Sequence, residues 1–70
     1  MDPVVYNRER GATNKCVGLI KSLQDGTENI KRAKGLIKMD PSLPVGASTG
    51  SRQSIIGRLR ADQYYRLRSQ

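Results

Sequence analysis

Arginine and tyrosine are the residues of this chain best suited to grip a partner, and they gather near its end. Guanidinium groups bind phosphates and carboxylates bidentately and stack on planar groups. Tyrosine rings stack on nucleic-acid bases or pack at protein interfaces. The candidate partner-binding residues are Arg52, Arg58, Arg60, Tyr64, Tyr65, Arg66 and Arg68. The chemistry that they predict is recognition, either of phosphate or of a protein surface.

The sequence offers few residues that could catalyse a reaction. There is no histidine to act as a base near neutral pH, and the one cysteine, Cys16, has no imidazole to activate it. Cys16 also falls on the apolar face of an expected helix, where cysteine behaves as a small buried hydrophobe. The six acidic residues are scattered singly. We therefore predict that the chain is not an enzyme.

Metal and cofactor sites are not expected either. A structural zinc site needs about four Cys or His ligands, and a site for a hard cation needs several converging carboxylates. The stretch at 46–51 resembles a glycine-rich phosphate loop, but Arg52 follows it where a Lys and a Ser or Thr are required. We predict no catalytic residue, no metal, no cofactor and no small-molecule substrate.

The charge of the chain is strongly basic and unevenly distributed. Thirteen Lys and Arg residues stand against six acids, which gives a net charge of +7. Such a field favours anionic partners, either nucleic acid or acidic protein surfaces. No apolar run approaches the roughly 18 residues of a membrane span, and the first residues do not resemble a signal peptide. The expected location is intracellular or within a virion, neither secreted nor transmembrane.

The elements that must position the arginines begin with an irregular arm over residues 1–12. Pro3 disfavours the helical conformation for the residue before it, and Val4, Val5 and Tyr6 favour β-structure. The arm either adds a strand to the sheet of a partner or stays disordered.

Helical periodicity follows over residues 13–39. Asp25-Gly26 is typical of a helix stop, and Thr27 can cap a second helix. These features predict an αα-hairpin over about 13–38. The alternative is one longer helix, because the apolar stripe stays nearly in phase across the join.

Residues 40–51 are rich in Pro, Gly and Ser and predict a linker between helical segments. Residues 52–70 then form a basic segment with a helix at about 52–68, which Ser51 or Thr49 can cap. The fold class is all-α, small and extended. The residues expected to pack on its apolar stripes are Cys16, Ile20, Leu23, Ile30, Ile37, Ile56, Leu59 and Leu67.

The function that follows is a small basic structural protein that bridges the subunits of a large complex. A minor capsid, tail or ribonucleoprotein component is the type expected, with other protein subunits as partners. The alternative is a nucleic-acid-binding protein that uses the arginine-rich C-terminal helix. A small regulator of one enzyme and an ordinary solvated helix are further alternatives, whereas a membrane surface is an unlikely partner because the apolar face is narrow.

Overall fold

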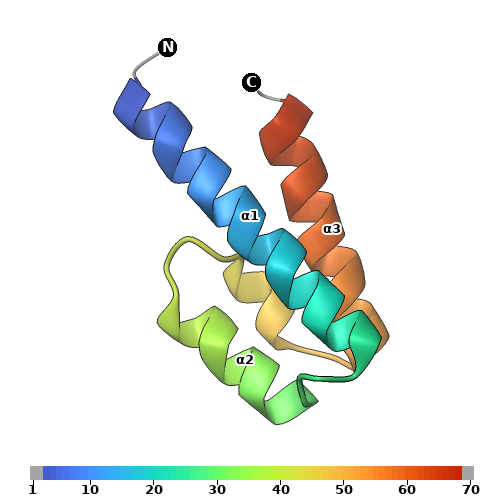
Figure 1. Ribbon diagram of the computed structural model, residues 1–70. Coiled ribbons are helices and arrows are strands. Elements are labelled where there is room, and N and C mark those ends of the chain that lie inside the picture. The colour runs from blue at the N-terminus through green and yellow to red at the C-terminus, as the bar shows by residue number, and fades with distance from the viewer. Residues whose placement is uncertain (1–2, 69–70) are drawn as a thin grey trace.

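The computed structural model describes the backbone of residues 3–68 and the side chains from Arg10 to Arg68. It contains three α-helices and one short 3-10 helix (Figure 1). They are α1 (Pro3–Asp25), α2 (Ile30–Met39), η1 (Val45–Ser48) and α3 (Arg52–Arg68). No strand occurs in this part of the chain, which confirms the all-α class. The first two residues of the predicted arm and the last two of the C-terminal segment lie outside the described residues.

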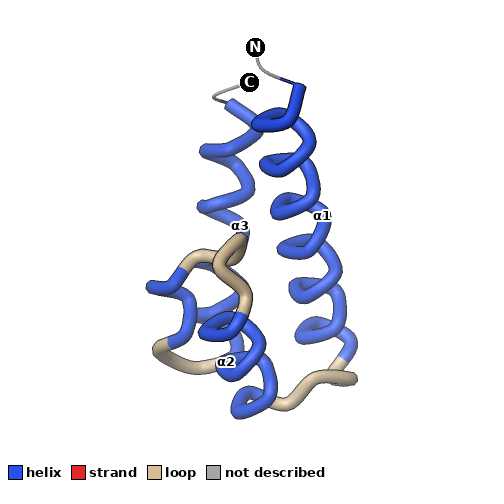
Figure 2. The backbone as a smooth tube through the Cα atoms, turned by 90° about the vertical axis from the view of Figure 1, so that its left-hand side faces the viewer, coloured by secondary structure: helices blue, strands red, loops and turns tan. Residues whose placement is uncertain are grey.

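Two long helices form the frame of the molecule. Helices α1 and α3 lie side by side and run in opposite directions, which brings both termini to one end (Figures 1 and 2). Helix α2 packs mainly on η1 at the other end, and η1 also contacts α3. The radius of gyration is 11.9 Å, close to the value of about 11 Å for a compact domain of this length. With principal extents of 36 × 21 × 20 Å, the molecule is elongated yet closely packed, so the predicted extended shape is not confirmed.

Helix α1 begins at Pro3, where the sequence predicted an extended arm over residues 1–12. Proline is well tolerated at the first helical position, because its missing N–H would have no partner there in any helix. The charged residues at 8–10 include good helix formers. Ala12 and Thr13 are already buried, so packing of α1 starts before residue 13, where the helical periodicity was expected to begin.

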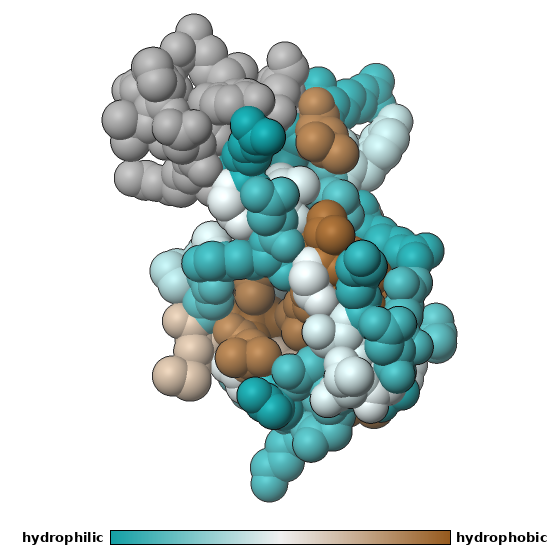
Figure 3. All heavy atoms as spheres, in the orientation of Figure 1, coloured by the Kyte–Doolittle hydropathy of each residue, from teal (hydrophilic) through white to brown (hydrophobic). Residues whose placement is uncertain are grey.

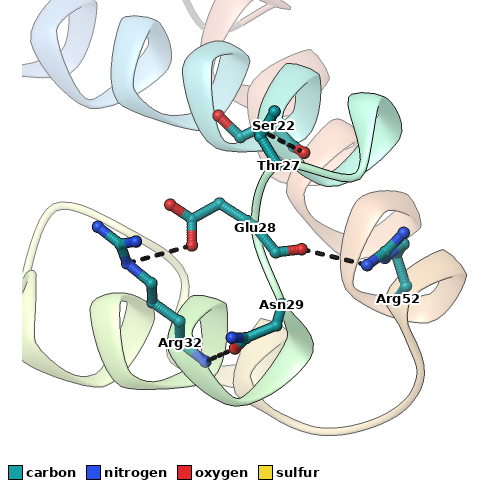
Figure 4. Close-up of polar contacts among 6 residues, drawn as sticks. All are labelled: Ser22, Thr27, Glu28, Asn29, Arg32 and Arg52. Carbon is teal, nitrogen blue, oxygen red and sulfur yellow. Dashed lines mark hydrogen bonds and ion pairs between the residues drawn. The ribbon is translucent and has the colours of Figure 1, made fainter.

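The chain breaks between α1 and α2 rather than continuing as one helix. Gly26 adopts a φ of +78°, a left-handed conformation that ends helices and that glycine reaches without a steric cost. The backbone N–H and the hydroxyl of Thr27 donate to the Ser22 carbonyl at 3.0 and 3.1 Å. Thr27 therefore closes α1, and Asn29 caps α2 by accepting a hydrogen bond of 2.7 Å from the Arg32 backbone N–H (Figure 4).

The two helices are not packed along each other as the hairpin prediction supposed. Helix α1 makes its main contact with α3, whereas α2 turns across the end of this pair and packs on η1. The pairing of distant segments was invisible in a pattern read along the chain, because both α2 and α3 offered an apolar stripe.

The segment predicted as a linker, residues 40–51, is part of the packed structure. Leu43 and Ala47 are buried in the core cluster, and the Arg58 guanidinium donates to the Gly46 carbonyl and to the Thr49 hydroxyl. The buried side chains of Leu43 and Ala47, together with Arg58 from α3, thus hold η1 in place. A composition that is typical of linkers also suits a tight turn.

One cluster of buried side chains joins all four elements. Of the residues predicted to pack, seven lie in this cluster or, for Ile30, against it. The cluster consists of Cys16, Leu19, Ile20, Leu23, Ala33, Ile37, Leu43, Ala47, Ile55, Ile56 and Leu59.

Leu67 is the exception among the residues predicted to pack, with 55% of its surface exposed. At about 100° per residue, Leu67 lies about 80° around the helix from Leu59, whereas Arg66 lies only about 20° from it. The inward direction on the last turns of α3 therefore belongs to Arg66. Counting Leu67 as part of the buried stripe was wrong.

Candidate interaction surface

Two of the α3 arginines predicted to bind a partner instead make hydrogen bonds to other segments of the chain. The Arg52 side chain donates a hydrogen bond of 3.1 Å to the backbone carbonyl of Glu28, which ties the start of α3 to the connection between α1 and α2 (Figure 4). Arg58 bonds to η1 through Gly46 and Thr49. A guanidinium that satisfies main-chain carbonyls has fewer donors for an outside partner.

Arg66 is occupied as well. Its Nε lies 2.8 Å from Oδ2 of Asp62, one helical turn earlier, and both side chains are about one-quarter exposed. The contact is an ion pair by distance, although that carboxylate oxygen is buried without the geometry of a hydrogen bond. The pair faces inward, so it neutralises the one acidic residue of α3.

The remaining predicted residues, Arg60, Tyr64, Tyr65 and Arg68, are exposed on the last turns of α3, but Tyr65 lies about 100° around the helix from Tyr64. Tyr64 is 59% exposed, and its ring meets that of Tyr65 edge-on at a centroid distance of 5.8 Å. We use the name distal α3 face for the residues that lie on one side of the helix, within a sector of about 100°. They are Arg60, Tyr64, Leu67 and Arg68.

The distal α3 face is basic and carries no acid of its own. Among the side chains from Arg10 to Arg68, no ion pair or hydrogen bond engages the guanidinium of Arg60 or of Arg68. Two unpaired guanidinium groups thus flank an exposed ring and an exposed leucine. Such a surface can contact either an anionic protein or a phosphate backbone.

Cys16 lies on the inner side of α1 and is fully buried. Burial raises the pKa of its thiol, and the nearby Asp62 carboxylate raises this pKa further. A protonated, inaccessible thiol is not a nucleophile. The structural role predicted for Cys16 agrees with this placement.

A second surface, which sequence reasoning missed, is an open groove of about 350 Å³ between α1 and α2. We call it the α1–α2 groove. The residues that line the α1–α2 groove are Lys15, Gly18, Leu19, Ser22, Glu28, Leu36, Asp40 and Leu43. The one signal available was Leu36, which falls outside the buried side of α2 and is 43% exposed.

The carboxylates of the α1–α2 groove differ in how well they are satisfied. Asp40 accepts hydrogen bonds from the Ser42 hydroxyl and backbone N–H and pairs with Lys15 at 3.1 Å. These contacts lower the pKa of Asp40 to about 2. Glu28 has only Arg32, whose Nε lies 3.5 Å away, and its Oε2 is buried without a hydrogen bond. Among the described residues, Oε2 of Glu28 is therefore closed off from solvent, with the Arg32 guanidinium as its ion-pair partner.

No cluster of His, Cys, Asp or Glu capable of holding a metal ion exists among the residues that the structure describes. None of the helices in this part of the chain is long and apolar enough to cross a membrane.

Comparison of the chain with protein-family models, curated proteins and solved structures finds no significant match.

Proposed function

We propose that the chain is a small structural subunit of a protein assembly, attached to its neighbours through the distal α3 face. The observation that carries the proposal is the exposure of Tyr64 and Leu67, on a helix whose other large aliphatic residues are buried. Tyrosine and arginine are enriched where binding energy concentrates in protein interfaces. A minor component of a capsid, a tail or a ribonucleoprotein particle is the kind of subunit meant.

The compact core supports attachment as a preformed body. Because α3 is already fixed against α1 and η1, binding through its outer side does not require ordering of a flexible segment. Preorganisation of this kind reduces the entropic cost of association. We therefore propose attachment through a folded helical subunit, in place of the extended bridge that the sequence predicted.

The occupation of three arginines favours protein over nucleic acid as the partner. Arg52, Arg58 and Arg66 already have partners within the chain, which leaves two arginines of α3 for phosphate. Affinity for a nucleic-acid backbone grows with the number of phosphates neutralised. Two such contacts contribute little by themselves, whereas a tyrosine beside arginines is a combination of residue types in which the binding energy of protein interfaces concentrates.

The test is isolation of the native complex through a tag on the chain, with nuclease treatment. We expect the co-purifying proteins to survive nuclease and to be lost with Tyr64→Ala, by about thirtyfold in affinity for a central anchor. Tyr65→Ala is the matched control, because Tyr65 is similarly exposed but points about 100° away. Complexes that nuclease dissolves, or that Tyr64→Ala leaves intact, would contradict the proposal.

Nucleic-acid binding is the second candidate function, and a specific observation favours it. Arg60 and Arg68 lie on either side of an exposed tyrosine ring, which can stack on a base. The measurement is fluorescence anisotropy of a labelled single-stranded oligonucleotide over a salt series. Replacing both arginines by Ala should reduce the slope of log K against log salt by about two. An unchanged slope would remove this candidate.

A further inference from the structure

We propose that the outer side of α2 binds the phosphate backbone of a nucleic acid through Lys31, Lys34 and Lys38. The proposed function concerns a different surface, the distal α3 face, so this inference goes beyond that function and does not rest on it. We use the name α2 lysine face for the three lysines together with Gly35, which lies between them in the sequence.

The α2 lysine face is one continuous strip of the helix surface. At about 100° per residue, its three lysines fall within a sector of about 60°, and each lies at least about 100° around the helix from the buried Ala33. Lys31 and Lys38 are exposed, and Lys34 is partly exposed. The three ammonium groups therefore point to the same side of α2, away from the core.

No acid neutralises the α2 lysine face. Helix α2 contains no Asp or Glu, and the acids that flank it in the sequence, Glu28 and Asp40, are paired with Arg32 and Lys15. Among the described side chains, no ion pair or hydrogen bond engages any of the three lysines. Adjacent charges of one sign raise the local concentration of anions. The α2 lysine face therefore favours a partner that carries several negative charges close together.

The spacing of the lysines suits a row of phosphates. One strand of B-DNA carries a phosphate about every 3.4 Å along the helix axis. Lys31 and Lys38 are about 10 Å apart along α2, which corresponds to about three such steps. Lysine is a point charge on a flexible stem, so it follows a backbone without a fixed geometry.

Gly35 leaves room for close approach of a strand. It lies beside Lys31 and Lys38 on the helix surface, within about 60° of each. It bears no side chain, and a Cβ built there would meet no atom within 4 Å. Glycine is unfavourable in the interior of a helix, and here no neighbouring atom requires its small size. A phosphate backbone can use the gap to come near the main chain of α2.

The α2 lysine face lacks the groups that other anionic partners require. Binding energy at protein interfaces concentrates in aromatic residues and arginine, whereas lysine is depleted there. A basic helix on a lipid surface buries its apolar side in the bilayer, but Ala33 and Ile37 of α2 already pack in the core cluster. The exposed Leu36 and Met39 lie about 100° or more around the helix from Lys38. A phosphate backbone is the partner that this surface fits best.

The position of α2 allows two partners to bind at once. Helix α2 lies at the end of the molecule opposite to the two termini, whereas the distal α3 face lies near them (Figure 1). Hydrophilic side chains project from the lower edge of the molecule, over α2 (Figure 3). One chain can therefore hold a protein neighbour at one end and a nucleic acid at the other.

The test is the salt dependence of binding of the full chain to a labelled DNA duplex, followed by fluorescence anisotropy. The double variant Lys31→Gln/Lys38→Gln removes two contacts and should reduce the slope of log K against log salt by about 1.8. At about 0.1 M salt, this change corresponds to a loss of affinity of about sixtyfold. With a labelled single strand, the slope should fall by about 1.4. An unchanged slope with both probes overturns the proposal.

Arg10→Gln/Lys21→Gln is the matched control for this double variant. Both residues are exposed on α1, and the control has the same net charge as Lys31→Gln/Lys38→Gln. It should retain the slope of the wild type. Circular dichroism should show wild-type helix content for both double variants, because the replaced side chains are exposed and Gln is a good helix former. If the control loses affinity equally, binding depends on overall charge and the proposal fails.

An acid placed within the α2 lysine face should weaken binding without removal of any lysine. Gly35→Glu puts a carboxylate four residues after Lys31 and three before Lys38, where it can pair with either. The slope with the duplex should fall by about 0.9 or more. Gly57→Glu is the matched control, because Gly57 of α3 also has nothing within 4 Å of its Cβ. If only Gly57→Glu lowers the slope, the phosphate contacts belong to α3 and the proposal is wrong.

Two further outcomes would assign the α2 lysine face to another partner. The first is binding to vesicles of phosphatidylcholine and phosphatidylserine that depends on Lys31 and Lys38, with no binding of either oligonucleotide. The second is a protein that survives nuclease treatment and is lost with Lys31→Gln/Lys38→Gln, again with no binding of either oligonucleotide. Each overturns the proposal. Neither changes the result of Tyr64→Ala in the nuclease-treated complex, so the proposed function stands or falls separately.

Discussion

The two halves of α3 use similar residues for opposite purposes. In the proximal half, Arg52–Leu59, the aliphatic side chains are buried and both arginines donate hydrogen bonds to other segments. In the distal half, residues 60–68, the leucine and both tyrosines are exposed. The helix is continuous, so the difference comes from what lies opposite each half.

The comparison shows that arginine content alone does not locate a binding surface. An arginine beside an unfilled backbone carbonyl is drawn into the fold, whereas an arginine on an outer face keeps its donors for a partner. What distinguishes the halves is the presence of η1 and the α1–α2 connection next to the proximal half only.

The largest effect should come from equivalent leucine truncations in the two halves. Leu59→Ala removes a fully buried side chain and should lower the free energy of unfolding by about 2–5 kcal/mol. Leu67→Ala should change it by less than about 0.5 kcal/mol, as exposed substitutions do. Urea unfolding followed by circular dichroism measures both. Similar losses for the two variants would show that the distal half is packed after all.

An intermediate effect should separate two arginines of the same helix. Arg52→Ala leaves the Glu28 carbonyl without its 3.1 Å hydrogen bond and should cost about 1–2 kcal/mol of unfolding free energy. Arg60→Ala, which breaks no bond within the described residues, should stay within about 0.5 kcal/mol. The same unfolding experiment applies. If Arg60→Ala lowered the free energy of unfolding as much as Arg52→Ala does, Arg60 would belong to the packed half of α3 and the comparison would be contradicted.

The smallest expected effect is a loss of stability at low pH, and it arises from Asp40 in the segment that precedes η1. The pKa of Asp40 is lowered from an ordinary 3.8 to about 2 by hydrogen bonds from Ser42 and by Lys15. The ionised carboxylate therefore stabilises the fold above pH 3.8, and this contribution is lost as the pH falls toward 2.

Asp40→Asn should remove this part of the acid sensitivity. The measurement is the urea midpoint between about pH 5 and pH 2, where a lowered pKa affects stability. Asp25→Asn is the matched control, because Asp25 is exposed at the end of α1, and it should leave the profile unchanged. An acid profile that Asp40→Asn does not flatten would contradict the assigned contacts.

The sequence predicted the all-α class and the bounds of the C-terminal helix because these depend on local signals. Apolar spacing and a cap before Arg52 are properties of neighbouring residues. The break after Asp25 is also local, since Gly26 permits the left-handed turn. Such features do not require knowledge of which helices meet.

The remaining features depend on contacts between distant residues. The burial of Leu43 and Ala47 turns an apparent linker into packed structure, and only the meeting of α2, η1 and α3 reveals it. The hydrogen bonds of Arg52 and Arg58 to backbone carbonyls also depend on contacts between distant residues, so the sequence did not reveal them. The α1–α2 groove combines residues from four stretches of the chain, so no single motif could have indicated it.

The labelling rate of Cys16 by a thiol reagent can report how often the core opens. Cys16 is the only cysteine of the chain, and it is sealed between α1 and α3 in the core cluster. A thiol reagent can reach it only when these helices separate, so the labelling rate counts opening events without any engineered probe. In an assembly, the same labelling rate would show whether contact with neighbouring subunits slows the local opening of an individual subunit.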